Sequence, residues 1–280
     1  MKVLIVGLGL MGGAYAYRLK NKGYNVYAYD INEDAIKIAK EKNYIDDGST
    51  NILDYIEKAD MIILCIYPQM IIEFLKENAK YFKPTQIITD ICGVKSSFVE
   101  EATKLALPAT YVSHHPMAGR EKSGVEYSNE VKFEEANFII TALDDTNSVA
   151  IDILKKMGED LGFKRITVID PKNHDRLIGF TSQLAHAIAV SLVNSDDNPN
   201  ETKKFIGDSY RDLTRIAMIN DNLWCELFLE NKDFLFEHIK RFEFELDILK
   251  QALANDDKEA LKKLFKSSTK TRKEMEKWEN

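Results

Sequence analysis

The chain of 280 residues contains only three cysteines, six prolines and two tryptophans. The cysteines, Cys65, Cys92 and Cys225, are too few and too widely spaced for a disulfide framework or a zinc site. Their scarcity excludes the small disulfide-stabilised secreted proteins and favours a reducing compartment. We therefore expect a cytoplasmic protein that binds no metal.

No hydrophobic run in the sequence approaches the length of a membrane span, and glycines interrupt the apolar opening MKVLIVGLGL, which argues against a signal peptide. Acidic residues (45) outnumber basic residues (38), so the net charge is -7. A chain of this charge repels polyanions, and local positive groups must hold any anionic small molecule. We therefore expect a small-molecule substrate, and neither a membrane nor nucleic acid as a partner.

Short apolar runs alternate with amphipathic segments as far as residue 169, which is typical of a parallel sheet covered by helices. The sequence predicts strands at residues 2–6, 25–29, 61–66, 86–90, 110–114, 137–141 and 165–168. After Asp170 and Pro171, which suit the start of a helix, only helical periodicity remains. The predicted fold class is α/β, with a Rossmann-type doubly wound sheet domain over residues 1–169 and an all-helical substrate and dimerisation domain over residues 170–280.

The predicted helical region 221–254 carries more apolar surface than one small domain can bury. Its apolar residues are Leu227, Phe228, Phe234, Leu235, Ile239, Phe242, Leu246 and Leu249. Surface of this kind is typical of an interface between subunits. We therefore expect a homodimer that forms through the helical domain.

A glycine-rich turn, GLGLMG, follows the first predicted strand and opens a helix. Gly7 permits the tight turn, Gly9 lets the backbone approach a pyrophosphate, and Gly12 lets the helix and the strand pack closely. Because the motif lies between a strand and a helix, it indicates dinucleotide binding, with a glycine turn that binds nothing as the alternative. The predicted cofactor-binding residues are Gly7, Gly9, Leu10, Met11, Gly12 and Asp30.

Asp30 ends the second predicted strand, where a carboxylate accepts hydrogen bonds from the hydroxyls of an adenine ribose. The same carboxylate repels a ribose 2′-phosphate, and the next positions, Ile31 and Asn32, supply no arginine to neutralise one. We therefore expect NAD rather than NADP as the cofactor. The alternative for Asp30 is the N-cap of a helix.

Two adjacent histidines, His114 and His115, lie where the fifth predicted strand ends. In a doubly wound sheet this edge faces the cofactor crevice, and an imidazole there can take the proton of a substrate hydroxyl while hydride leaves the same carbon. Adjacent strand residues point to opposite sides, so at most one of the pair faces a ligand. The alternative is that either is a core or loop histidine with satisfied hydrogen bonds.

The segment HPMAGREKSG, which begins at His115, resembles the HPMAGxExSG signature of the prephenate and arogenate dehydrogenases, the TyrA family. Four further segments resemble family elements in the family's order, and they are DICGVK at 90–95, HD at 174–175, SQLAH at 182–186 and RDLTRIA at 211–217, the last followed by Trp224. Together they span nearly the whole chain. The resemblance implies NAD-dependent oxidative decarboxylation of prephenate to 4-hydroxyphenylpyruvate in tyrosine biosynthesis, with arogenate as the alternative substrate.

The resemblance also implies roles for single residues. By position, His115 is the base for the ring hydroxyl of the substrate, and Arg215 holds a carboxylate. The pocket would be lined by Glu121, Ser182, Gln183, His186 and Trp224, with the tryptophan contributed by the partner in a dimer. The sequence departs from the family where Gly93 replaces a frequent serine and Gln183 and Ala185 replace a histidine and a proline. A hydroxyl that assists the histidine must then come from elsewhere, and Ser96 and Ser113 are the candidates.

Without the resemblance, several of these residues have other readings. The helix predicted over 171–194 places Ser182 and His186 on one face, where a ligand, water or a neighbouring helix must satisfy them. Arg215 could form a surface ion pair with Asp212 or Asp208, and Trp224 could belong to the core. Lys95 either binds substrate or is solvated at a helix start, and Arg120 is a second cation near His115.

Two other functions fit parts of the pattern. A dehydrogenase of the β-hydroxyacid kind shares the glycine-rich opening, but such enzymes use a lysine on the interdomain helix, and residues 182–186 contain none. A non-catalytic NAD-sensing regulator would keep the fold without needing both His115 and Arg215. An assay for NADH formation with prephenate separates the regulator from the enzyme.

Overall fold

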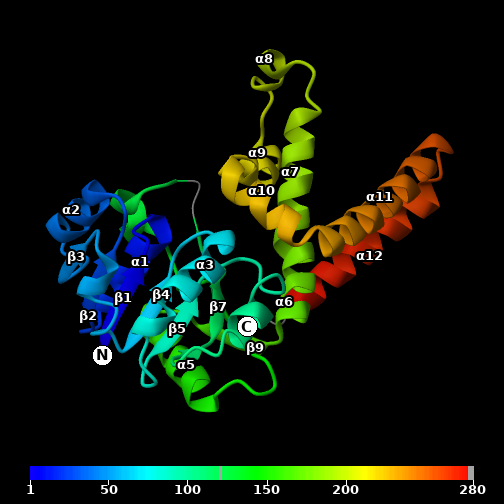
Figure 1. The fold of residues 1–280 in the computed structure, drawn as a ribbon. Helices are drawn as coiled ribbons and strands as arrows, with labels where there is room; N and C mark the ends of the chain where they lie inside the picture. The colour runs from blue at the N-terminus through cyan, green and yellow to red at the C-terminus, as the bar shows by residue number, and fades with distance from the viewer. Residues whose placement is uncertain (120–121, 277–280) are drawn as a thin grey trace. The chain divides into compact units, whose positions relative to one another are not determined.

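The computed structural model describes residues 1–119 and 122–276. Backbone contacts divide the chain into a larger unit, Met1–Lys232, and a smaller unit, Asp233–Asn280. The larger unit contains both sheets and the helices as far as α10, and the smaller unit consists of two long helices (Figure 1).

Six parallel strands form the main sheet of the larger unit (Figure 1). They are β1 (Lys2–Val6), β2 (Asn25–Tyr29), β3 (Asp47–Ser49), β4 (Met61–Leu64), β5 (Ile87–Asp90) and β6 (Thr110–Tyr111). Their order is β3-β2-β1-β4-β5-β6, which is the Rossmann order with its reversal between β1 and β4. The predicted Rossmann-type sheet is therefore confirmed, and the glycine-rich turn after β1 lies at the switch point where such folds bind dinucleotides.

Helices bury both faces of this sheet, which is why its central strands β1 and β4 are apolar at nearly every position. Val3 and Ile5 pack with α1 (Leu10–Asn21), α2 (Glu33–Glu41) and α5 (Ser148–Leu161). Leu4 and Val6 face the other side, which is covered by α3 (Pro68–Asn78) and α4 (Val99–Lys104). Single turns of 3-10 helix, η1 (Ile52–Asp54), η2 (Ala79–Tyr81) and η3 (Val125–Glu130), complete this part of the chain.

A second, three-stranded sheet consists of β7 (Ser113–Pro116), β8 (Asn137–Thr141) and β9 (Arg165–Ile169). Here the prediction of one strand over 110–114 in a parallel sheet is wrong. The chain leaves the main sheet after Val112, whose N–H still donates to the Ile88 carbonyl at 3.0 Å. From Ser113 onward it pairs antiparallel with β8. The segment that carries His114 and His115 therefore belongs to the second sheet.

The helix predicted over 171–194 is divided into three parts. Helix α6 (Pro171–Ile178) begins at Asp170, whose side chain accepts a hydrogen bond from the Asn173 N–H at 2.9 Å. A π-helical turn, η4 (Gly179–Gln183), then widens the helix before α7 (Leu184–Asn194). The remaining elements of the unit are α8 (Pro199–Thr202), α9 (Asp208–Thr214), the 3-10 turn η5 (Arg215–Ala217) and α10 (Asp221–Glu230). π turns of this kind occur often at functional sites.

The stretch Pro171–Asn194, 24 residues long, is long and apolar enough to cross a membrane by length and composition. The expectation that no stretch approaches such a length is therefore wrong. Its apolar character comes mainly from the leucine, isoleucine, valine and alanine residues of its last part, Leu184–Asn194. Core helices of soluble proteins meet the same criterion, so it is weak evidence for a membrane.

The smaller unit is a helical hairpin of α11 (Lys232–Ala254) and α12 (Lys258–Glu276) (Figure 1). Two helices cannot enclose a core of their own. Large apolar side chains are accordingly exposed within the single chain, and they include Phe236, Phe244, Leu246, Leu253 and Phe265, between 45% and 65% accessible.

Candidate active site

The turn between β1 and α1 depends on glycine at two positions. Gly7 has a φ of +95°, which other residues rarely adopt. At Gly12 a Cβ atom would lie 1.9 Å from the Gly7 carbonyl oxygen, so a side chain would separate the helix from the turn. Gly9 precedes α1, and nothing lies within 4 Å of where its Cβ would be. The backbone at the start of α1 is therefore open to a ligand.

Asp30 binds this turn. One carboxylate oxygen accepts a hydrogen bond from the Leu8 N–H, and the other accepts from the Asn32 N–H at 2.8 Å. Asn32, not Asp30, is the N-cap of α2, because its side chain accepts from the Asp34 N–H at 2.9 Å. The helix-cap alternative for Asp30 is therefore wrong.

A pocket of about 480 Å³ opens beside Asp30 and Gly9. Ala35 and Ile38 give it an apolar wall, and Glu126 lies on its border. An acidic group at the strand end, an apolar wall and an open helix N-terminus fit the adenosine half and the pyrophosphate of a dinucleotide. The residues of this chain therefore fit the NAD that the sequence predicts.

Gly13 joins this turn to the segment after the histidine loop. Its missing side chain lets η3 approach, since a Cβ there would lie 2.2 Å from Ser128 Oγ and 2.8 Å from Val125 Cγ2. Ser128 Oγ donates to the Leu10 carbonyl at 2.8 Å. Two segments more than one hundred residues apart in sequence thus border the same pocket.

His114 and His115 point to opposite sides of β7, as predicted. His114 is fully buried, with Nε2 at 2.8 Å from the Tyr15 hydroxyl and Nδ1 at 2.6 Å from the Thr89 hydroxyl. Burial lowers its pKa to about 3, helped by the Lys95 charge. Both ring nitrogens are occupied, so His114 is the core histidine of the pair.

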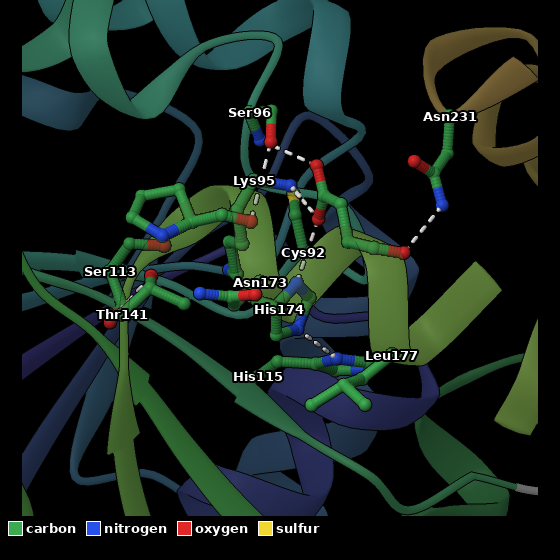
Figure 2. A network of polar contacts seen from close by, with 12 residues as sticks. Cys92, Lys95, Ser96, Ser113, His115, Thr141, Asn173, His174, Leu177 and Asn231 are labelled. Atoms are coloured by element: carbon green, nitrogen blue, oxygen red, sulfur yellow. Dashed lines mark hydrogen bonds and ion pairs between the residues drawn. The ribbon is translucent and has the colours of Figure 1, made fainter. Parts of the chain in front are cut away.

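His115 has a different environment. Its Nδ1 lies 2.9 Å from His174 Nε2, and His174 Nδ1 lies 2.7 Å from Asp175 Oδ1 (Figure 2). The three side chains form a continuous chain of hydrogen bonds between β7 and the first turns of α6. Burial lowers the pKa of His115 well below its ordinary value, and the neighbouring His174 and Lys95 lower it further. His115 is therefore neutral near pH 7 and able to accept a proton.

Lys95 is buried, so the reading of a lysine solvated at a helix start is wrong, whereas its contact with substrate stays a prediction. Its side chain is 0% exposed, and its ammonium donates to Asp90 Oδ1 and to the His114 carbonyl, each at 2.7 Å. Asp90 also accepts from the Tyr111 hydroxyl at 2.7 Å. Burial raises the pKa of Asp90, but the Lys95 charge and the hydrogen bonds to the carboxylate together lower it more, so the carboxylate stays ionised. The pair fastens β5 to the strand that carries the histidines.

Gly93 lies against the imidazole of His115. A Cβ at Gly93 would be 3.6 Å from His115 Nε2 and 3.5 Å from Leu227 Cδ2. Among the described residues, neither of the two serines considered as substitutes for the family serine is bonded to His115, and the buried Ser113 Oγ has no hydrogen-bond partner. Ser96 Oγ donates to the Pro171 carbonyl at 3.3 Å, and Ser113 is fully buried within β7 (Figure 2). The group bonded to His115 is instead His174.

Gln183 is 1% exposed, and protein groups bind both ends of its amide. Its Nε2 donates to the Leu227 carbonyl at 2.8 Å, and its Oε1 accepts from Asn231 Nδ2 at 2.7 Å. Asn231 also donates to the Asp175 carbonyl at 2.9 Å. The amide thus connects the π turn to the end of α10, and the substrate contact of Gln183 stays a prediction.

His186 and Trp224 are in contact, with ring centroids 3.7 Å apart. His186 Nδ1 donates to the Ser182 carbonyl at 2.9 Å. All three residues are partly exposed, on the π turn, α7 and α10. The interhelical-network alternative is thus realised at Gln183, whereas this aromatic pair borders accessible surface.

Arg215 is exposed in η5, which packs against α7. Asp208, one suggested ion-pair partner, binds Arg211 at 2.7 Å. Arg120 and Glu121, both predicted to line the substrate pocket, lie outside the described residues. The convergence of Arg215 with His115 on one ligand stays a prediction.

The sequence pattern identified His174 and Asp175 as a family element but predicted no function for either residue. A signal was nevertheless present in the pattern. The buried residues of α6 are Pro171, His174, Asp175 and Ile178, which is the spacing of one helix face. Two ionisable side chains on the buried face of a helix must be satisfied by partners, and those partners are His115 and the backbone at Lys95 and Ser96.

A Rossmann sheet, an open glycine turn with an acid at the next strand end, and a neutral histidine on a nearby strand define a dinucleotide-dependent dehydrogenase. Family models agree. The model for the nucleotide-binding domain of prephenate dehydrogenase matches residues 15–167, and the model for its dimerization domain matches residues 170–267. The chain therefore belongs to the prephenate dehydrogenase family.

Individual relatives are similar over nearly the whole chain. The prephenate dehydrogenase of Lactococcus lactis is 30% identical over 282 residues, with 98% of this chain and 77% of the relative covered. The cyclohexadienyl dehydrogenase of Zymomonas mobilis is 29% identical over 277 residues, covering 96% of this chain and 94% of the relative. A crystal structure of prephenate dehydrogenase from A. aeolicus with hydroxyphenyl propionate and NAD+ has a TM-score of 0.88, 32% identity and 98% coverage of both chains.

Proposed function

We propose that this protein is a prephenate dehydrogenase that uses NAD to convert prephenate to 4-hydroxyphenylpyruvate with loss of carbon dioxide. The observation that carries the proposal is a neutral, hydrogen-bonded histidine, His115, on a strand of a Rossmann enzyme of this family. Family membership over both domains supports the substrate, and the pocket at Asp30 supports the cofactor.

His115 is the general base. Its lone pair takes the proton of the ring hydroxyl, and its low pKa keeps it unprotonated before the substrate binds. NAD, held by the glycine turn after β1 and by Asp30, would supply the acceptor for the hydride of the carbon that carries this hydroxyl. The resulting ring ketone is conjugated toward the quaternary carbon, which loses its carboxylate as carbon dioxide. The two electrons of the broken bond complete an aromatic ring, so the step needs no nucleophile from the protein.

The substrate carries two carboxylates, and the protein must hold them by cations. Arg215 is the proposed partner of one, because a guanidinium binds a carboxylate through two parallel hydrogen bonds. The aromatic pair of His186 and Trp224, with Ser182 beside it, is the proposed lining of the ring site. Arg120 and Glu121 are proposed to complete the pocket from the histidine loop.

Asp30 is the proposed determinant of the cofactor. Its carboxylate lies in the pocket beside Asn32 and Asp34, so a ribose 2′-phosphate would meet negative charge while a free 2′-hydroxyl could donate to it. Gly7, Gly9, Leu10, Met11 and Gly12 would hold the pyrophosphate by the backbone at the start of α1.

The proposed organisation is a cytoplasmic homodimer with a cofactor domain over residues 1–169 and a helical domain over residues 170–280. The exposed phenylalanines of α11 and α12 support the dimer, as does the description of the matching family model. Equilibrium sedimentation should give twice the mass of one chain, and the mass of a single chain would contradict the assembly.

A steady-state comparison tests the reaction. The purified protein is given prephenate or arogenate with NAD or NADP, and NADH or NADPH formation is followed together with carbon dioxide release. We expect turnover with prephenate and NAD, with one carbon dioxide for each NADH. Preference for arogenate would move the assignment to an arogenate dehydrogenase. No turnover with either would overturn it, and turnover with a simple β-hydroxyacid alone would indicate the other dehydrogenase class.

A further inference from the structure

We propose that His174 is a positioning residue for His115. Together with Asp175 it holds the His115 imidazole in the tautomer that carries its proton on Nδ1, so that Nε2 is the basic atom. The inference rests on the proposed role of His115 as the general base, and it identifies the group that prepares this base for the reaction.

The chain of hydrogen bonds begins at a carboxylate whose orientation is locked. Asp175 Oδ1 accepts from the Lys95 N–H at 2.9 Å, and Oδ2 accepts from the Ser96 N–H at 2.7 Å. Both donors are backbone groups at the end of the loop after β5, so the carboxylate cannot rotate without losing one of them. An ionised carboxylate only accepts hydrogen bonds. His174 Nδ1, 2.7 Å from Oδ1, must therefore carry a proton and donate it.

The second link follows from the first. A neutral imidazole has one N–H and one lone pair, so a proton on His174 Nδ1 leaves Nε2 as an acceptor. Burial lowers the pKa of His174 and outweighs the opposing effect of Asp175, so its ring is neutral at pH 7. His115 Nδ1, 2.9 Å from this acceptor, must then be the donor. The proton position on both rings is thus set by Asp175.

The third step concerns the other nitrogen of His115. Its Nε2 faces Gly93, where the nearest side-chain position would be 3.6 Å away. Glycine at this place puts no donor or acceptor next to Nε2. The tautomer of His115 is therefore selected from the Nδ1 side in this chain.

Charged and titratable groups around the pair lower the pKa of His115, but they act on His174 in opposite directions. His174, Lys95 and His114 each lower the pKa of His115 electrostatically. Asp175 and Asp90 raise the pKa of His174, whereas Lys95 lowers it. Because neither ring is charged near neutral pH, the position of the single proton on each ring decides whether His115 can act as a base.

Two substitutions of His174 separate positioning from packing. His174→Gln keeps a carbonyl oxygen that can accept from His115 Nδ1, and His174→Leu keeps volume but removes the acceptor. Asn173→Ala is the matched control, because Asn173 lies next to His174 but binds Asp170. Thermal melting is recorded for each protein, and kcat and KM are measured with prephenate and NAD. The His115 tautomer is read from ¹⁵N chemical shifts of histidine-labelled protein without substrate.

In the wild type we expect a protonated Nδ1 and an unprotonated Nε2. His174→Leu should lose about 10- to 100-fold in kcat, the range for groups that orient a catalytic residue, with KM for both ligands changed less than about threefold. His174→Gln should recover most of this loss, and Asn173→Ala should match the wild type.

A proton on His115 Nε2 in the wild type would overturn the proposal. Equal kcat values for the His174→Leu and His174→Gln variants would overturn it as well. If the wild type oxidises neither prephenate nor arogenate, the proposed function fails, while the ¹⁵N shifts of His115 still decide the tautomer. If the leucine variant does not fold, the wild-type shifts and the glutamine variant carry the test.

Discussion

The neighbouring histidines His114 and His115 differ in chemistry because their surroundings differ. Both nitrogens of His114 are bound within the core, to Tyr15 and Thr89. In the part of the chain that the structure describes, Nδ1 of His115 is bonded to His174, and its Nε2 faces a glycine. The alternation of side chains along a strand produces this division, so the base and the core residue can be adjacent in sequence.

The role of His115 predicts a specific kinetic loss. His115→Asn should lower kcat by about 10²- to 10⁴-fold, which is the usual contribution of a general base. NAD binding, measured by fluorescence titration, should stay unchanged, because the proposed cofactor site lies on other elements. Tyr15→Phe is the matched control, since it removes a hydrogen bond from His114 instead. Full turnover of the asparagine variant would exclude His115 as the base.

At the scale of elements, the strand and turn that bind the cofactor could be predicted because their signals are local. Strands β1, β2 and β8 begin and end at the predicted residues. The glycine spacing needs only the turn itself, and Asp30 needs only the end of the next strand. Local patterns of this kind depend little on the rest of the fold.

Other features depend on partners far away in the sequence. The division of the predicted strand 110–114 follows from the antiparallel partner β8, which no local pattern shows. The sequence suggested a solvated Lys95, but its side chain is buried and its ammonium donates to Asp90 and to the His114 carbonyl. The link between His115 and His174 joins residues 59 positions apart. Such contacts form only in the folded chain. The sequence therefore predicted which residues belong to the candidate site but not the hydrogen bonds that connect them.

Close packing of α1 on η3 predicts sensitivity at one glycine. Gly13→Ala should destabilise the protein by about 1–3 kcal/mol, as overpacking usually does, because the new Cβ would overlap Ser128 Oγ and Val125 Cγ2. Urea unfolding followed by circular dichroism measures this. Gly9→Ala is the matched control, since its Cβ would meet nothing within 4 Å. Equal stability of the Gly13→Ala variant and the wild type would contradict the packing described.

At the scale of the whole molecule, buried histidines make stability depend on pH. Burial lowers the pKa of His114, His115 and His174, whereas histidines in the unfolded chain titrate near pH 6.5. Below that pH these histidines bind protons in the unfolded chain but stay unprotonated in the folded protein. The free energy of unfolding should therefore be at its full value above about pH 6.5 and should fall as the pH drops below it.

Urea midpoints at pH 7.5, 6.0 and 5.0 measure this dependence. Carboxylates with lowered pKa values, such as Asp90, lose their contribution only in more acidic solutions, below the ordinary range near pH 4. The interval from pH 6.5 to pH 5 therefore isolates the histidines. His114→Gln should flatten the dependence in this interval, and a midpoint that stays constant in the wild type would contradict the prediction.

One stretch of extended chain is shared by the two sheets of the larger unit, and this has a consequence for accuracy in folding. Thr110 and Tyr111 are aligned with β5, while His114 and His115 are aligned with Ile140 and Ile139 of β8. A slip by a single position would exchange the two imidazoles, burying the reactive one and exposing its neighbour. Because both ladders resist that slip, the error would have to break the pairing with β5 and with β8 at once, which favours the register that places His115 beside His174.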